Sequence, residues 1–102
     1  MDLDKALVRG FSRLAILSLL RRGDMRAYQL LKVMENLFEV KLSLSSFYTM
    51  LKELEVRGYI SSTSRGEGDK IYSITEKGRR ILAEAKERLG RKLDALKEIL
   101  GL

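Results

Sequence analysis

Apolar residues recur at helical spacing through the first third of the chain. Between Asp4 and Arg22 the leucines fall three or four positions apart, which predicts a helix, and Gly10 interrupts the pattern at a bend. Gly23-Asp24 then suits the C-terminal cap of that helix and the N-cap of the next. A second apolar face predicts a helix from about Met25 to Phe38.

Residues 39–42 alternate between polar and apolar side chains, which predicts one short strand. Ser43 follows as a candidate N-cap for a third helix that ends at Arg57-Gly58. One arc of this helix is apolar and contains Phe47 and Leu51. The opposite side and its borders carry small polar groups, one cation and a few other residues, namely Ser45, Ser46, Tyr48, Thr49, Lys52, Glu53 and Val56.

After the third helix the pattern changes from helical to β. Residues 59–64 and 70–74 are rich in β-forming side chains, and the Gly-rich turn 65–69 between them predicts a hairpin. Thr75 is a candidate N-cap for a last helix from Glu76 to Leu100. The expected fold is α+β and mostly helical, and no repeat or low-complexity linker divides it.

Three helices followed by a hairpin is the order of a winged helix-turn-helix, in which the third helix enters the DNA major groove. Hydroxyls and cations contact phosphates and base edges. We therefore expect DNA contacts from Ser45, Ser46, Tyr48, Thr49 and Lys52 on the third helix, and from Arg65 and Lys70 at the base of the hairpin. The plainer interpretation is that these serines only cap the helix, and for Ser43 we favour it.

The last helix carries a leucine stripe. Its 25 residues would span ~38 Å, more than the ~26 Å expected of a compact domain of this size. The stripe either folds back on the first helix or closes a two-fold dimer together with it, and we favour the dimer. Residues 1–74 would then form the DNA-binding domain and residues 75–102 the dimerisation helix of one compact unit. The expected interface residues are Leu7, Phe11, Leu82, Leu89, Leu93, Leu96 and Leu100.

Composition narrows the chemistry. The chain has 102 residues, with 20 Lys and Arg against 14 Asp and Glu, so its net charge is +6 and a polyanion is the first candidate partner. It has no Cys and no His, which removes thiolate and imidazole chemistry and nearly all zinc and haem ligation. We therefore expect no enzymatic activity, no metal and no cofactor.

Two further expectations concern location and habitat. No apolar run is long enough to cross a membrane and the N-terminus fits no signal peptide, so a cytoplasmic location is expected. Gln29 and Asn36 are the only residues with side-chain amides. A low content of amides together with a high content of charged residues is typical of heat-adapted proteins. The absence of Pro argues mildly against heat adaptation.

The third helix and the strand after it carry a family resemblance. Residues 44–60, LSSFYTMLKELEVRGYI, resemble the recognition helix and first wing strand of PadR-like transcriptional regulators. Ala27-Tyr28-Gln29-Leu30 is similar to the Gly-Tyr-Glu-Leu that opens the second helix of that family. Residues 70–79 resemble its Lys-x-Tyr-x-Leu-Thr-x-x-Gly-Arg/Lys motif. The resemblance extends over nearly the whole chain.

The sequence also departs from the family pattern. Thr49 stands where the family usually has Pro, Glu53 stands where a basic residue is common, and the hairpin tip carries Glu67 and Asp69 in place of basic residues. Residues 58–74 hold two basic and two acidic side chains, so the hairpin has no net charge. Whether the hairpin contacts DNA is therefore left open.

The resemblance, the charge and the element order together favour a dimeric, sequence-specific transcriptional repressor that binds an inverted repeat in double-stranded DNA. The resemblance also implies a small-molecule effector at the dimer interface, but the last helix has no aromatic side chain to stack on one. The alternative is a winged-helix module that binds a protein through its leucine-rich helix and does not read DNA. The neutral hairpin and Glu53 favour that alternative.

Overall fold

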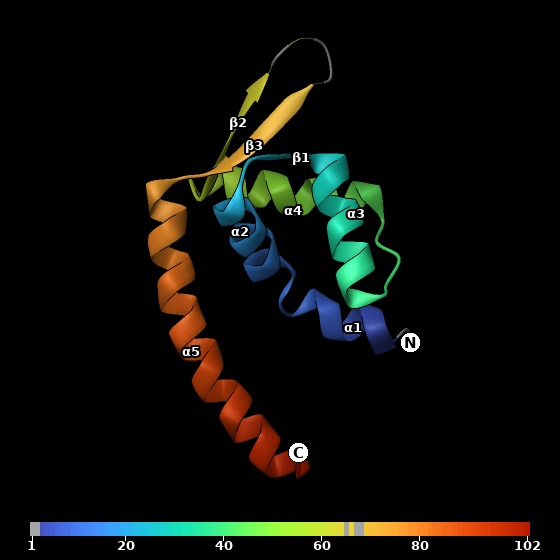
Figure 1. Ribbon diagram of the computed structural model, residues 1–102, viewed down its shortest axis with the longest axis vertical. Coiled ribbons are helices and arrows are strands. Elements are labelled where there is room, and N and C mark those ends of the chain that lie inside the picture. The colour runs from blue at the N-terminus through green and yellow to red at the C-terminus, as the bar shows by residue number, and fades with distance from the viewer. Residues whose placement is uncertain (1–2, 65, 67–68) are drawn as a thin grey trace.

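The computed structural model describes residues 3–64, 66 and 69–102, so the predicted DNA contact at Arg65 lies outside the described residues. Figure 1 shows a group of helices with a hairpin projecting at one end and a long helix running away from the hairpin. The helices are α1 (Leu3–Arg9), α2 (Ser12–Arg22), α3 (Ala27–Phe38), α4 (Leu44–Val56) and α5 (Glu76–Leu100). The strands are β1 (Met25–Arg26), β2 (Ile60–Ser64) and β3 (Lys70–Ile74).

The core forms where the apolar faces of α2, α3 and α4 meet the base of the hairpin and the start of α5. The largest fully buried apolar side chains are Ile16, Leu20, Leu30, Met34, Phe47, Leu51, Ile60 and Leu82. Their positions confirm the predicted apolar faces of the second and third helices. Because α4 buries one arc against this core, its opposite face is left on the surface.

The predicted hairpin is present, and a third strand joins it. In the antiparallel sheet, of order β1-β3-β2, Ile60 pairs with Ile74 and Met25 pairs with Tyr72. Strand β1 was missed because two residues carry no readable alternation. The second helix therefore begins at Ala27, and its N-cap is Arg26 and not Asp24 as predicted.

Two further expectations about the first half need correction. The first segment is two helices, and the chain turns between them at Gly10 and Phe11, where the Ser12 hydroxyl donates to the Val8 carbonyl at 2.7 Å. The strand predicted for residues 39–42 is wrong, because that segment is a loop. The Glu35 carboxylate accepts the Leu42 backbone N–H at 2.9 Å, so the loop is held by a helix side chain and not by a neighbouring strand.

Helix α5 has the predicted bounds and cap: the Thr75 hydroxyl accepts the Gly78 N–H at 3.0 Å. Its first turns pack on α2, so this part of the leucine stripe folds back on the first segment. Leu82, one of the predicted interface residues, is only 2% exposed and packs within this core. The rest of α5 extends away, and the molecule measures 51 × 31 × 21 Å.

The remaining predicted interface residues lie at or near the surface. Phe11 is half-buried, edge-on to Phe38 with ring centroids 4.9 Å apart, and Leu89 is also half-buried. The exposed apolar side chains of α1 and of the end of α5 are Leu3, Leu7, Leu93, Leu96, Ile99 and Leu100. No helix in the described part of the chain is both long and apolar enough to span a membrane.

Candidate nucleic-acid interface

The outward face of α4 is polar because the inward face is committed to the core. Its N-cap is Ser43, as predicted, whose hydroxyl accepts the Ser46 N–H at 3.4 Å. Ser45, Thr49 and Lys52 are exposed and share the face opposite Phe47 and Leu51. The structure therefore brings these three predicted contact residues onto one surface.

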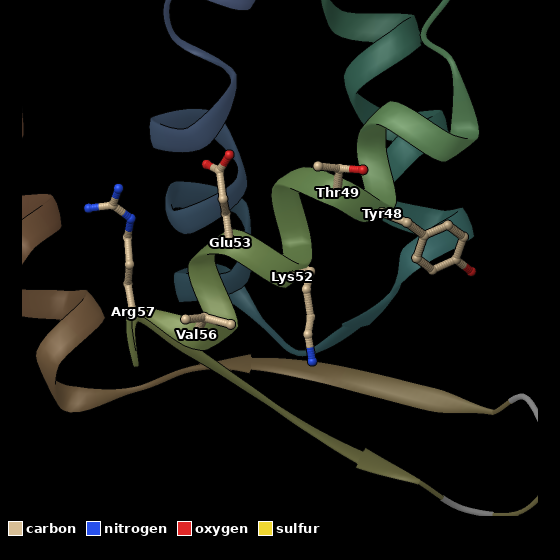
Figure 2. A pocket seen from close by; sticks show the side chains of 6 residues that line it. All are labelled: Tyr48, Thr49, Lys52, Glu53, Val56 and Arg57. Atoms are coloured by element: carbon tan, nitrogen blue, oxygen red, sulfur yellow. The ribbon is translucent and has the colours of Figure 1, made fainter.

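A shallow depression lies along the second half of this face. It is lined by Tyr48, Thr49, Lys52, Glu53, Val56 and Arg57, all from α4 or its C-cap. Figure 2 shows the Lys52 side chain running toward the side where β2 and β3 lie, whereas Thr49 and Glu53 point toward the opposite side. Val56 is 75% exposed on this face. An apolar group on this face can contact a thymine methyl in a major groove.

The charge of Glu53, one of the departures from the family pattern, is compensated within the chain. Arg13 of α2 donates to the Glu53 carboxylate at 2.8 Å. That hydrogen bond lowers the pKa of the Glu53 carboxyl and raises the pKa of the Arg13 guanidinium. Glu53 is therefore an anion with a cation beside it, and it weakens the positive field of the α4 face less than its sequence position implies.

The hydroxyls at the start of α4 make bonds of their own. The Thr49 hydroxyl donates to the Ser45 backbone carbonyl at 3.0 Å, and the Ser43 and Ser45 hydroxyls lie 3.0 Å apart. With its proton used in this way, Thr49 presents outward mainly as an acceptor, which suits the amino groups of adenine or cytosine better than a phosphate. Ser46 lies on the border of the helix that faces α1 and α2.

The hairpin and the start of α3 extend this surface. A second hollow is lined by Arg26, Tyr28, Tyr48, Ser64, Lys70, Ala27 and Tyr72, so Tyr48 and Lys70 from the predicted set come together there. Arg26 and Tyr28 were missed as contact candidates, although the Ala-Tyr-Gln-Leu motif that contains Tyr28 marked the position. Both are exposed at the start of the helix that crosses the DNA backbone in helix-turn-helix proteins.

The charge of Asp69, in the hairpin turn, is compensated in a similar way. Arg26 donates to the Asp69 carboxylate at 2.6 Å, and this hydrogen bond raises the pKa of the guanidinium. Lys32 lies over the Tyr28 ring, 5.3 Å from its centroid. The surface between the start of α3 and the turn end of the hairpin thus holds three cations close to two tyrosine rings, namely Arg26, Lys32 and Lys70 with Tyr28 and Tyr48.

The arrangement offers hydrogen-bonding groups and charge. Within the described residues, no three acidic side chains come together in a group that would hold a metal ion. No buried side-chain nitrogen or oxygen in this part of the chain lacks a hydrogen-bond partner. The surface is thus equipped to bind an anionic partner.

Sequence and structure comparisons identify the class of protein that carries this surface. Residues 16–84 match the Transcriptional regulator PadR-like family. The chain belongs to the PadR-like family. The match begins in α2 and ends in the first turns of α5, so it includes α4, the hairpin and the core that positions them. Comparison with curated protein sequences gives no significant match.

Solved structures agree with this family membership. A transcriptional regulator from Clostridium thermocellum is 25% identical, with a TM-score of 0.83 over 91% of this chain and 93% of its own. A PadR family transcriptional regulator from Eggerthella lenta is 26% identical, with a TM-score of 0.81 over 93% and 86%. PadR from Bacillus subtilis, solved in complex with operator DNA, is 29% identical, with a TM-score of 0.61 over 71% of this chain and 44% of its own.

These likenesses confirm the predicted family and fold class, a mostly helical α+β winged helix with a long C-terminal helix. PadR-like proteins are transcriptional regulators and not, as a class, enzymes.

Proposed function

We propose that this chain is a dimeric, sequence-specific DNA-binding transcriptional regulator that represses by occupying promoter DNA. The observation that carries the proposal is the exposed polar face of α4, which holds Ser45, Thr49 and Lys52. Figure 2 shows that Lys52 points from this face toward the side of the hairpin strands. The net charge of +6 suits a polyanionic partner. The operator complex of the Bacillus subtilis relative supports the same class of partner. Such a regulator would act in the cytoplasm.

The surface supports a division of roles. Thr49 lies at the centre of the α4 face and suits a base edge, because its oxygen faces outward as an acceptor. Lys52 points toward the hairpin (Figure 2) and Lys70 is the first residue of its strand β3, so both cations are placed to contact phosphates. Tyr48 can donate its hydroxyl to a phosphate while its ring rests in the hollow beside β3.

The proposal includes a dimer because a single α4 contacts too few base pairs to specify an operator. The exposed leucines at the end of α5 give a second copy an apolar surface to cover, and Leu93 and Leu96 are 45% and 49% exposed. Two-fold symmetry then favours an inverted repeat in double-stranded DNA, with half-site centres ~34–36 Å apart or a multiple of that. No residue of α5 offers aromatic stacking to a small-molecule effector at this interface.

Selection of bound sequences from random duplexes, followed by affinity measurements at several salt concentrations, tests the proposal. Thr49→Ala should lower affinity for the selected site and relax preference at one base pair, at a cost of ~1–3 kcal/mol. Lys52→Ala should weaken binding to selected and random duplexes alike and reduce the salt slope by about one charge. Lys92→Ala, at an exposed lysine on α5, is the matched control and should bind like the wild type.

The competing function makes the opposite prediction. If the wild type shows no salt-dependent retention on duplex DNA, or if Ser45→Ala, Tyr48→Phe, Thr49→Ala and Lys52→Ala all bind as it does with the fold intact, α4 is not a reading element. The chain would then be a winged-helix interaction module that binds a protein.

A further inference from the structure

A strongly basic hollow lies on the other side of α4 from the hairpin. Lys5 and Arg9 of α1, Arg13 at the start of α2 and Lys41 in the loop before α4 line it, together with the hydroxyl-bearing Ser43 and Ser46. We refer to this site as the basic hollow. We propose that the basic hollow binds phosphates of the DNA backbone on the side of the recognition helix away from the wing. This inference rests on the DNA-binding function proposed above.

The charges of the basic hollow favour an anion. Lys5, Arg9 and Arg13 recur every four residues and meet Lys41 from a separate segment. Lys5 and Arg9 lie one turn apart on α1, and like charges at this spacing repel each other, so a bound anion would relieve the repulsion. Among the described residues, no carboxylate lines the basic hollow.

Acidic side chains lie near two of the cations in the basic hollow. Glu53 pairs with Arg13, and the charge of Lys41 contributes to the lowered pKa of the Glu35 carboxyl. The largest cause of the lowered Glu35 pKa is the hydrogen bond that its carboxylate accepts from the Leu42 backbone N–H, in the loop before α4. Arg9 forms no ion pair with a described residue, so its charge is available to meet a phosphate.

The position of the basic hollow links it to base reading. Thr49 lines both the basic hollow and the depression along α4, so the two sites are continuous on the surface. A duplex placed against Thr49 and Lys52 has its backbone on either side of α4. The hairpin meets one side, and the basic hollow faces the other. Contacts on both sides would fix how α4 sits in the groove without adding sequence preference.

The test uses Arg9→Gln with Lys41→Gln, which removes two charges and keeps most of each side chain. Arg13 is left intact because it pairs with Glu53 of α4. Losing two phosphate contacts should lower the slope of log affinity against log salt by ~1.8. The ratio of wild-type to variant affinity should then rise about 12-fold as salt falls from 200 to 50 mM, equally for selected and random duplexes. The ratio of selected to random affinity should stay unchanged.

Lys86→Gln with Lys92→Gln on α5 is the matched control, since both lysines are exposed and the change in net charge is the same. Light scattering and thermal melting check that both double variants keep the wild-type assembly and fold. The inference is overturned if the Arg9/Lys41 variant has the same slope of log affinity against log salt as the wild type. It is also overturned if the slope falls equally in the control, because that would indicate only a general effect of net charge. A titration with inorganic phosphate separates the two phosphate sources, and phosphate binding without the slope change also overturns it. If the inference is overturned but Thr49→Ala still relaxes specificity, the proposed DNA-binding function stands without the basic hollow. If the wild type binds no duplex, the proposed function and this inference both fail.

Discussion

The contact between α5 and the hairpin makes an unusual stability prediction. Gly78 lies in the first turn of α5 and is buried against the hairpin. A Cβ built there would collide with the Tyr59 carbonyl oxygen and lie 2.8 Å from Ile74 Cγ1. The Tyr59 carbonyl accepts the Thr75 backbone N–H at 3.0 Å, and the Thr75 hydroxyl donates to the Gly58 carbonyl at 2.6 Å. The helix therefore cannot move away from the added methyl without straining these bonds.

The expected change in the free energy of unfolding of Gly78→Ala has the opposite sign to the change that helix propensity predicts. Gly to Ala inside a helix ordinarily stabilises by about 1 kcal/mol. Overpacking against backbone costs ~1–3 kcal/mol, and weakening one of the Thr75 hydrogen bonds adds about 1 kcal/mol. We expect Gly78→Ala to lower the free energy of unfolding by ~1–3 kcal/mol, and Tm by roughly 4–8 °C for each kcal/mol.

Thermal and urea unfolding at one protein concentration measures the effect. Gly90→Ala is the matched control on the same helix, because a Cβ there meets nothing within 4 Å. This control should be as stable as the wild type, or more stable by up to about 1 kcal/mol. A Gly78→Ala protein with unchanged or raised Tm would refute the close-packing argument, and equal losses in both variants would point to α5 in general and not to this contact.

Three other predictions concern assembly, DNA geometry and pH. The double variant Leu93→Glu with Leu96→Glu places charges on the exposed stripe of α5, so light scattering should show a monomer or insoluble protein. If the variant stays a dimer, the interface is assigned wrongly, and if the wild type is a folded monomer, the dimer proposal itself is wrong. Footprinting should show paired half-sites, and single unpaired half-sites would count against the two-fold geometry. The lowered pKa of Glu35, caused first by the Leu42 N–H, gives stability that is present above the ordinary glutamate pKa and lost as pH falls through the lowered value. The stability difference between wild type and Glu35→Gln, measured by urea unfolding, should therefore be present at pH 7 and shrink below about pH 4, and a constant difference would show that this carboxylate does not carry the effect.

Much of the local structure follows from the sequence alone. The periods of apolar residues place α3, α4, α5 and the hairpin, because burying one face of an element requires a regular spacing of apolar side chains. The caps at Ser43 and Thr75 were also predicted, since a hydroxyl before a helix satisfies a backbone N–H within the same few residues. The exposed face of α4, with Thr49 and Lys52, follows from the position of its apolar face.

Only the tertiary structure decided which distant residues meet. The Arg13–Glu53 pair joins residues 40 positions apart, and Arg26 reaches Asp69 across 43. Strand β1 forms because the free edge of β3 provides backbone groups for it to pair with. Leu82 belongs to the leucine stripe in the sequence but is buried in the core, because α5 packs on α2 at this point. The spacing of residues along one element does not show which residue of another element it will meet. Sequence period determines which face of an element is buried, whereas the packing of whole elements determines what each exposed charge finds beside it.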